Sequence, residues 1–141
     1  MLDEVTDFHE AFGHPINEYP STEEIELRFN LIKEEFAETA DELADYSEFV
    51  EKNSRNLTPA GFEELYTIRM QLTKELADML YVIYGTAVSF GLPLEQVFEE
   101  VHKSNMSKLG EDGKPILRED GKILKGPNYK AADIAQFFFT R

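Results

Sequence analysis

The sequence contains no cysteine, and its 14 lysines and arginines are outnumbered by 28 aspartates and glutamates, for a formal net charge of -14. The lack of cysteine excludes disulfides and a cysteine nucleophile. An excess of negative charge repels a phosphate backbone, so we expect no binding to nucleic acid. The chain has no charged-then-apolar leader at its N-terminus and no apolar run long enough to span a bilayer. We therefore expect a soluble, cytoplasmic protein that does not bind membranes.

Apolar residues recur at helical spacing through most of the chain, which predicts an all-α fold. The predicted helices cover residues 3–12, residue 21 to about residue 50, about residue 58 to residue 90, and a stretch that begins at Pro93. Ser21 is the predicted N-cap of the second helix, and Gly91 is predicted to end the third. A loop is predicted between them over residues 52–61, which are polar and contain Pro59. A chain of 141 residues fits a single domain. We expect residues 1–108 to form a bundle of four to five helices.

The segment of residues 109–141 is rich in glycine and charge, unlike the helices before it. Asp112-Gly113 and Asp120-Gly121 are turn signals, and the apolar residues on either side of the second turn are able to pair as a small hairpin. A disordered tail is the alternative. The isoleucines, leucines and phenylalanines of this segment favour docking on the helical bundle as part of the same domain.

Acidic residues are concentrated in the predicted long helix. Residues 34–51 include no lysine or arginine, and several of their carboxylates are four residues apart, as in Glu34 and Glu38, where like charges repel. The acidic residues of this stretch are Glu34, Glu35, Glu38, Asp41, Glu42, Asp45, Glu48 and Glu51. Such a run is most often a solvated helical face. A site that gathers carboxylates around a cation is the alternative.

A second acidic pair, Glu75 and Asp78, lies on one face of the third predicted helix, and Asp78 is followed by the apolar residues 79–83. A carboxylate in such surroundings costs several kcal/mol unless it is paired, protonated or bound to metal. We expect that Lys74 does not easily reach the face of Asp78. Oxygen ligands without sulfur or an obvious histidine suit a hard divalent cation, and Mg²⁺ typically combines a few carboxylates with waters and substrate phosphates.

In the helix after Pro93, the apolar residues Leu94, Val97, Phe98 and Val101 are expected to face inward. This face ends in two polar residues, Asn105 and Lys108. Lys108 is able to meet a phosphate as a point charge, and Asn105 is able to hydrogen-bond a sugar, a phosphate or a metal-bound water. The alternative is ordinary capping, since a lysine near a helix C-terminus interacts favourably with the helix dipole.

The two acidic motifs, Glu34-Glu35-x-x-Glu38 and Glu75-x-x-Asp78, together resemble the signature of the all-α NTP pyrophosphohydrolases. This superfamily contains MazG, the dimeric dUTPases and phosphoribosyl-ATP pyrophosphohydrolase. The strings of residues 75–85 and 101–108, the Asp-Gly-Lys repeats and residues 125–129 are similar to the MazG-like branch. The resemblance extends from about Phe8 to Tyr129. One departure is the long gap between the acidic motifs, residues 39–74, which leaves the substrate class open.

The resemblance implies a helical bundle that is completed by a second subunit of a homodimer or tetramer. It implies that Mg²⁺, or Mn²⁺ in its place, is held by Glu34, Glu35, Glu38, Glu75 and Asp78. It also implies that Asn105 and Lys108 contact the nucleotide, and Tyr81, which lies in a matching string, is predicted to bind substrate as well. We expect Glu35 or Glu38 to accept the proton of the attacking water.

The apolar residues also predict self-association. The long helix is expected to face inward with the apolar stripe of Phe29, Ile32, Phe36 and Leu43. Leu27 and Leu31 add a second apolar side to this helix, and residues 76–90 of the next helix are apolar nearly all round. Four or five helices within one chain are not able to bury all of these apolar faces. We expect at least a homodimer, and the sequence leaves open whether it is a dimer or a tetramer.

The predicted reaction is Mg²⁺-dependent hydrolysis of a nucleoside triphosphate to its monophosphate and pyrophosphate, in the upkeep of the nucleotide pool. The sequence does not identify the base, so dUTP, another nucleotide or a damaged one remains open. His9, His14 and Phe12 either line a base pocket or only pack. Phosphoribosyl-ATP pyrophosphohydrolase is the alternative enzyme. A non-catalytic acidic adaptor that binds a basic partner is the alternative of another class, and the presence of all five carboxylates argues against it.

Overall fold

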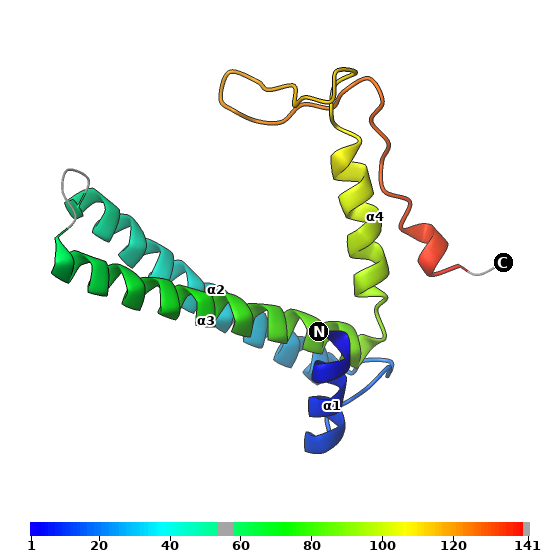
Figure 1. Ribbon diagram of the computed structural model, residues 1–141. Helices are drawn as coiled ribbons and strands as arrows, with labels where there is room; N and C mark the ends of the chain where they lie inside the picture. Colours follow the sequence, from blue (N-terminus) through cyan, green and yellow to red (C-terminus); the bar gives the residue numbers. More distant parts are fainter. Residues whose placement is uncertain (54–57, 140–141) are drawn as a thin grey trace. The chain divides into compact units, whose positions relative to one another are not determined.

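The structure is a computed structural model that describes residues 1–53 and 58–139. In this part of the chain it contains the helices α1 (Leu2–Phe12), α2 (Thr22–Asn53), α3 (Pro59–Phe90) and α4 (Leu94–Met106), and the short 3-10 helix η1 (Ala135–Phe137) (Figure 1). No named strand occurs within the described ranges. The predicted all-α fold is confirmed. The predicted loop is shorter than expected, because α2 continues to Asn53 and α3 begins at Pro59, and its residues 54–57 lie outside the described residues.

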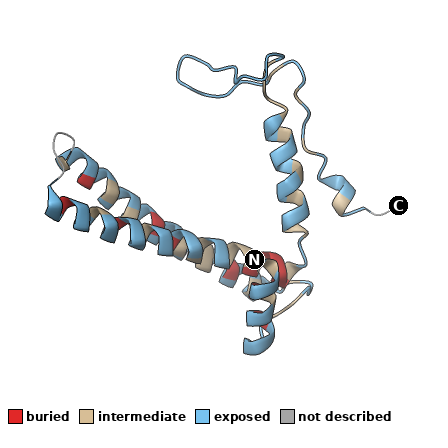
Figure 2. Ribbon diagram, in the orientation of Figure 1, coloured by how far each residue is buried: buried red, intermediate tan, exposed pale blue. Residues whose placement is uncertain are grey.

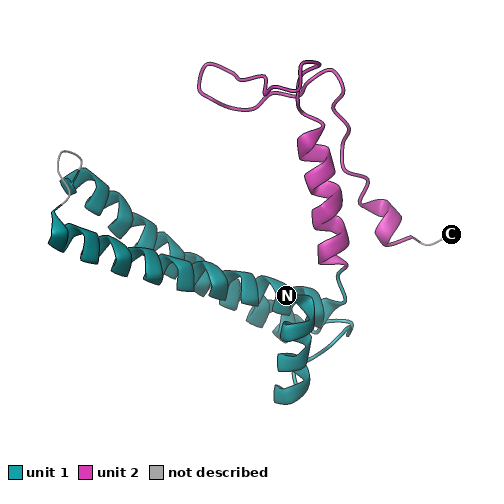
Figure 3. Cartoon of the chain, in the orientation of Figure 1, with its two compact units in different colours: residues 1–92 teal, residues 93–141 magenta. Residues whose placement is uncertain are grey.

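The chain divides into two compact units, residues 1–92 and residues 93–141 (Figure 3). The first contains α1, α2 and α3, and the second contains α4 and the C-terminal segment. Each unit is described by itself. The docking of residues 109–141 on the bundle of residues 1–108 therefore stays a prediction.

Local hydrogen bonds fix the helix ends in the first unit. Before α2, the Ser21 hydroxyl accepts the backbone N–H of Glu24 at 3.1 Å, as predicted for an N-cap. The hydroxyl of Thr58 caps α3 in the same way by accepting the N–H of Gly61 at 3.1 Å. Gly91 ends α3 in the left-handed conformation, with φ of 63°, which costs a glycine little.

Helices α2 and α3 form an antiparallel hairpin along most of their length, and α1 packs against the C-terminal part of α3 (Figure 1). The buried apolar residues of this unit are Val5, Phe49, Ile68, Ala87 and Val88. Figure 2 shows that the buried residues of this unit, apolar and polar together, lie mainly where the helices meet. The face of α3 that meets α2 also carries Glu75, which is buried. The hairpin therefore places charged residues inside its seam.

A stripe of large apolar residues on α2 remains exposed in the single chain. Phe29, Phe36, Leu43 and Val50 are seven residues apart, hence on one helical face, and Phe36 is 64% exposed. Periodicity predicted that this stripe faces inward, which is wrong for the isolated chain. The reason is that α3 packs on a neighbouring face of α2, which carries the buried residues Arg28, Thr39 and Phe49.

In the second unit, the C-terminal segment folds back along α4. The hydroxyls of Ser104 and Ser107 donate to the backbone oxygen of Lys130 at 2.8 and 3.2 Å, and the N–H of Gly126 donates to Lys108 O at 3.0 Å. Phe98 and Val101 are exposed and α4 has no buried residue, so the C-terminal segment does not cover the face that was predicted to point inward. Packing of this face on the helical bundle stays a prediction.

The predicted hairpin is present in minimal form. A single antiparallel bridge joins Leu117 and Ile123, and the N–H of Arg118 donates to Lys122 O at 2.8 Å. Gly113 and Gly121 adopt positive φ angles of 75° and 82°, as the two Asp-Gly turn signals predicted.

No single described helix is both long enough and apolar enough to cross a membrane. Only α3 and α4 taken together meet such a test, by length and composition alone.

Candidate metal centre

Three carboxylates meet at the middle of the α2–α3 hairpin. Glu35 of α2 and Glu75 and Asp78 of α3 each offer an oxygen, and these oxygens lie within 4.8 Å of one another. The geometry follows from the helices, because Glu75 and Asp78 are one turn apart on α3 and the antiparallel hairpin sets Glu35 opposite them. The structure therefore brings together one residue of the first acidic motif and both residues of the second.

The surroundings of Glu35 are unfavourable for a negative charge. Its Oε2 is buried and has no hydrogen-bond partner among the described residues. Burial raises the pKa of Glu35, and the nearby charges of Glu38 and Asp78 raise it further. A buried carboxylate oxygen without a donor is costly, so the site lacks a positive or hydrogen-bonding group on the α2 side.

The other two glutamates of the first motif lie outside the group of three. The Glu38 side chain is exposed, and a hydrogen bond with Glu75 raises the pKa of Glu38. Glu34 is also exposed. Of the five ligands implied by the sequence resemblance, the structure thus brings together Glu35, Glu75 and Asp78. Glu38 hydrogen-bonds to Glu75, and Glu34 is not part of the group.

Lys74 reaches the cluster, contrary to the expectation from sequence. Its Nζ lies 2.8 Å from Asp78 Oδ2 and 3.1 Å from Glu75 Oε1. Lys74 and Asp78 are four residues apart, and neighbours at this spacing share a face of the helix, which the expectation overlooked. Hydrogen bonds to Asp78 and Glu75 raise the pKa of Lys74, so its ammonium stays charged.

The group of three fits a hard divalent cation. Its donors are all carboxylate oxygens, and the orphaned Oε2 of Glu35 is a buried acceptor that a cation would satisfy. Mg²⁺ binds oxygens at about 2.1 Å and keeps several positions for water and phosphate. Since the group spans up to 4.8 Å, its side chains need only close slightly to bind one ion.

Aromatic rings gather next to this cluster, where α1 meets α3. The Phe8 ring makes an edge contact with Tyr81 at 5.5 Å between centroids and stacks on His14 at 5.9 Å. It also lies 4.3 Å from the Phe12 ring. Phe12 and His14 are exposed. Tyr81 is one turn beyond Asp78 on α3, so the aromatic group and the carboxylates are neighbours within one unit.

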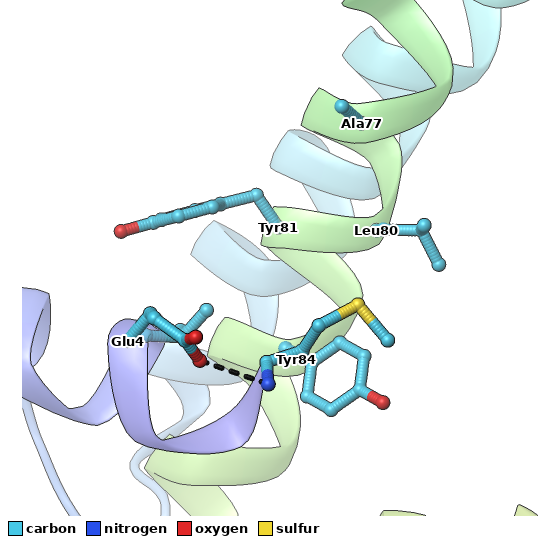
Figure 4. Close-up of a pocket in the computed structure, with 7 residues that line it drawn as sticks. Glu4, Ala77, Leu80, Tyr81 and Tyr84 are labelled. Atoms are coloured by element: carbon cyan, nitrogen blue, oxygen red, sulfur yellow. Dashed lines mark ion pairs between the residues drawn. The ribbon is translucent and has the colours of Figure 1, made fainter. Parts of the chain in front are cut away.

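Tyr81 also lines a cavity of about 230 Å³. It is lined by Met1, Glu4, Val5, Ala77, Leu80, Tyr81 and Tyr84. Figure 4 shows Tyr81 and Tyr84 projecting from α3 on the side of α1. The lining is mostly apolar, with Glu4 at its edge in an ion pair with the N-terminal amine.

A second polar cluster lies in the same seam, and the sequence did not predict it. Arg28 is 6% exposed, and its Nε donates to Glu24 Oε1 at 2.7 Å. The Ser89 hydroxyl donates to the same oxygen at 3.2 Å. Arg28 Nη2 is buried and has no partner among the described residues. The spacing of Glu24 and Arg28 at i and i+4 is a sequence signal for an ion pair but not for its burial.

His9 belongs to this second cluster and has a packing role. It is fully buried, its Nδ1 lies 2.8 Å from Pro15 O, and burial lowers its pKa. Gly85 makes room for it, because a Cβ at that position would lie 3.3 Å from His9 Nε2 and 3.2 Å from Arg28 Nη1. Of the three residues weighed for a base pocket, His9 is thus the one that lies inside the core.

Two predicted substrate ligands lie in the second unit, Asn105 within α4 and Lys108 just after its end. The Nζ of Lys108 donates to Asn105 Oδ1 at 2.7 Å. Their contact with each other is defined, and their approach to a nucleotide stays a prediction.

Residues 5–105 of the chain match the model of the family described as phosphoribosyl-ATP pyrophosphohydrolase. The uncharacterised protein L479 of Acanthamoeba polyphaga mimivirus is 29% identical to this chain over 130 residues, which are 86% of this chain and 40% of L479. The chain thus spans well under half the length of that relative. A solved structure from Exiguobacterium sp. 255-15, provisionally assigned as an NTP pyrophosphohydrolase, is 27% identical; the match covers 93% of this chain and 88% of that one, with a TM-score of 0.46.

Proposed function

Because this chain belongs to the phosphoribosyl-ATP pyrophosphohydrolase family, we propose that it hydrolyses a nucleoside triphosphate to the monophosphate and pyrophosphate with Mg²⁺ as its cofactor. The observation that supports this most is the group of Glu35, Glu75 and Asp78 with its unsatisfied oxygen. Three like charges in a partly buried seam are unfavourable unless a cation binds them. We place the reaction in the cytoplasm, in the upkeep of the nucleotide pool.

In this proposal Glu35, Glu75 and Asp78 hold the divalent cation, with Mn²⁺ as a substitute for Mg²⁺, and Glu34 and Glu38 complete the acidic surroundings. A bound cation neutralises the triphosphate oxygens and lowers the pKa of a coordinated water. The Glu35 oxygen without a donor suits a ligand. Glu38 suits the proton acceptor, because it is exposed and has a raised pKa beside the cluster.

The substrate's base would lie on the aromatic group of Phe8, Phe12, His14 and Tyr81. Exposed rings offer stacking worth about 1–3 kcal/mol per base, and these rings are next to the carboxylates along α3. We retain Asn105 and Lys108 as predicted contacts of the sugar or the phosphates, since an amide and an ammonium suit both.

A second copy of the chain would cover the exposed stripe of α2. Phe29, Phe36, Leu43 and Val50 form a continuous apolar face, and such faces on a water-soluble chain usually mark an interface. The proposed enzyme is therefore a homodimer or tetramer. Sedimentation at micromolar concentration tests this, and a monomer would contradict it.

Phosphoribosyl-ATP is the second candidate substrate, because the matching family is described by that activity. The deciding experiment is a panel of nucleoside triphosphates, including dUTP and dGTP, together with phosphoribosyl-ATP, assayed for pyrophosphate with Mg²⁺. We expect pyrophosphate from at least one triphosphate. Release only from phosphoribosyl-ATP would establish the second candidate. Orthophosphate as the only inorganic product, or no product from any substrate as for a non-catalytic adaptor, would overturn the proposal.

A further inference from the structure

Lys74 is a charged neighbour of the carboxylates to which the proposed reaction assigns no role. Its ammonium lies 2.8 Å from Asp78 Oδ2 and 3.1 and 3.2 Å from the two oxygens of Glu75. Among the ion pairs of residues 1–53 and 58–139, the pairs of Lys74 are those that involve the group of three. The lysine therefore occupies the α3 side of the site that is proposed to hold a cation.

One ammonium does not balance the group. It brings a single positive charge to three carboxylates, and its ion pairs are with the two residues of α3. Glu35 on α2 keeps a buried oxygen without a partner. A divalent cation within reach of all three oxygens would balance the site better than the lysine does.

The lysine and a divalent cation compete for the same atoms. Nζ contacts both oxygens of Glu75 and Oδ2 of Asp78. Both residues are members of the group whose oxygens lie within 4.8 Å of one another, so the lysine shares at least the Glu75 oxygen of that group. Two cations that share these oxygens would lie within a few ångströms of each other, where their repulsion is strong. One of them has to leave when the other binds.

We propose that Lys74 is an internal counter-cation that occupies the cluster until a divalent cation displaces it, and thereby weakens metal binding. This inference rests on the proposed metal site. The lysine is able to leave easily, because its side chain is 64% exposed and its flexible stem carries a well-hydrated ammonium. An exposed i, i+4 ion pair holds it only weakly. In the absence of metal it reduces the repulsion among the carboxylates.

The test is Mn²⁺ binding by isothermal titration calorimetry, without nucleotide, beside the melting temperature in EDTA. The main variant is Lys74→Met, which keeps most of the stem and removes the charge, and Lys74→Gln is the second variant in case the first does not fold. Lys74→Arg keeps the charge. Lys52→Met is the matched control, because Lys52 also forms an exposed i, i+4 pair, with Glu48, away from the group of three.

We expect Lys74→Met and Lys74→Gln to bind Mn²⁺ about tenfold more tightly than the wild type, since a charge at this distance changes the binding of another ion by one or more orders of magnitude. Both should melt at a lower temperature than the wild type in EDTA. Lys74→Arg and Lys52→Met should bind Mn²⁺ as the wild type does. Unchanged or weaker binding by the two uncharged variants would overturn this inference alone. Absence of Mn²⁺ binding by every protein, the wild type included, would overturn the proposed metal site with it.

Discussion

The seam between α2 and α3 contains two polar clusters that differ in their charge balance. Near α1, the buried Arg28 is paired with Glu24, which also accepts the Ser89 hydroxyl. At the middle of the hairpin, the carboxylates of Glu35, Glu75 and Asp78 have only the exposed Lys74 as a basic partner among the described residues. Oppositely charged groups within a core neutralise each other, whereas a group of like charges requires a counter-ion from outside the protein. The charge balance thus suits the first cluster to a structural role, and we propose that the second binds a cation.

The largest difference between the clusters should be in catalysis. We expect Asp78→Asn to lower pyrophosphate release by roughly a hundredfold or more, since a metal ion contributes several kcal/mol of transition-state stabilisation. Circular dichroism should show intact helices, because asparagine keeps the shape of the side chain. Full activity in Asp78→Asn would place the metal site elsewhere.

The structural cluster should instead determine stability. Arg28→Met leaves the Glu24 carboxylate in the core with the Ser89 hydroxyl as its side-chain partner. Removing one partner of a buried pair costs about 3–5 kcal/mol of unfolding free energy. Urea denaturation checks this value, and the gain in melting temperature on addition of Mg²⁺ should remain. A stability equal to that of the wild type would show that the pair contributes nothing net.

The two clusters should also respond to pH in opposite directions. Folding raises the pKa of Glu35 above its usual 4.5, so the native state binds that proton more tightly. The metal-free protein thus loses stability as the pH rises from 4.5 through the raised pKa. For His9, whose pKa is lowered from 6.5, stability is instead lost as the pH falls below 6.5.

Glu35→Gln separates these two contributions. In EDTA at pH 7 we expect this variant to melt at a higher temperature than the wild type, and the difference should vanish near pH 4. Glu24→Gln should have the opposite effect at pH 7, because it breaks the pair with Arg28. A lower melting temperature for Glu35→Gln at pH 7 would mean that Glu35 is satisfied in the native protein.

The smallest expected effect concerns Gly85, against which the structural cluster packs. An alanine Cβ would lie 3.2 Å from Arg28 Nη1 and 3.3 Å from His9 Nε2. Both neighbours are held by hydrogen bonds, to Glu24 and Pro15. Crowding of about 1–3 kcal/mol should therefore exceed the gain of about 1 kcal/mol from better helix propensity. We expect a net loss of about 1 kcal/mol by urea denaturation, with an unchanged Mg²⁺ response. A Gly85→Ala protein that is more stable than the wild type would show that Arg28 and His9 shift at little energetic cost.

The local signals in the sequence were sufficient for the helices. Ser21 caps α2 and Gly91 ends α3 as predicted, because caps depend on hydrogen bonds within a few residues. Which face of a helix is buried depends on the partner helix instead. The Phe29 and Phe36 stripe was assigned inward from its periodicity, yet α3 packs on another face of α2. Periodicity identifies the apolar faces of a helix. It does not indicate which of these faces packs against another helix of the same chain.

The sequence was sufficient to predict the acidic residues of the candidate site, but it did not predict which basic residues lie near them. Glu35, Glu75 and Asp78 were selected because carboxylates without basic neighbours are unusual, and the structure places them together. The contact of Lys74 with Asp78 is compatible with their spacing of four residues, but the sequence does not show that the lysine reaches both acids of α3. The burial of Arg28 has no sequence signal, because a lone arginine in a helix is usually exposed. A buried ion pair becomes visible only when the facing helix, with Gly85 and Ser89, is in place.

We propose that Glu35, Glu75 and Asp78 bind a divalent cation, whereas the neighbouring cluster around Arg28 stabilises the fold. The most direct test is the melting temperature with and without Mg²⁺ for the wild type and Asp78→Asn. A ligand that binds only the native state stabilises it by mass action. The account predicts that Mg²⁺ raises the melting temperature of the wild type and has much less effect on Asp78→Asn. Equal increases in both proteins would contradict it.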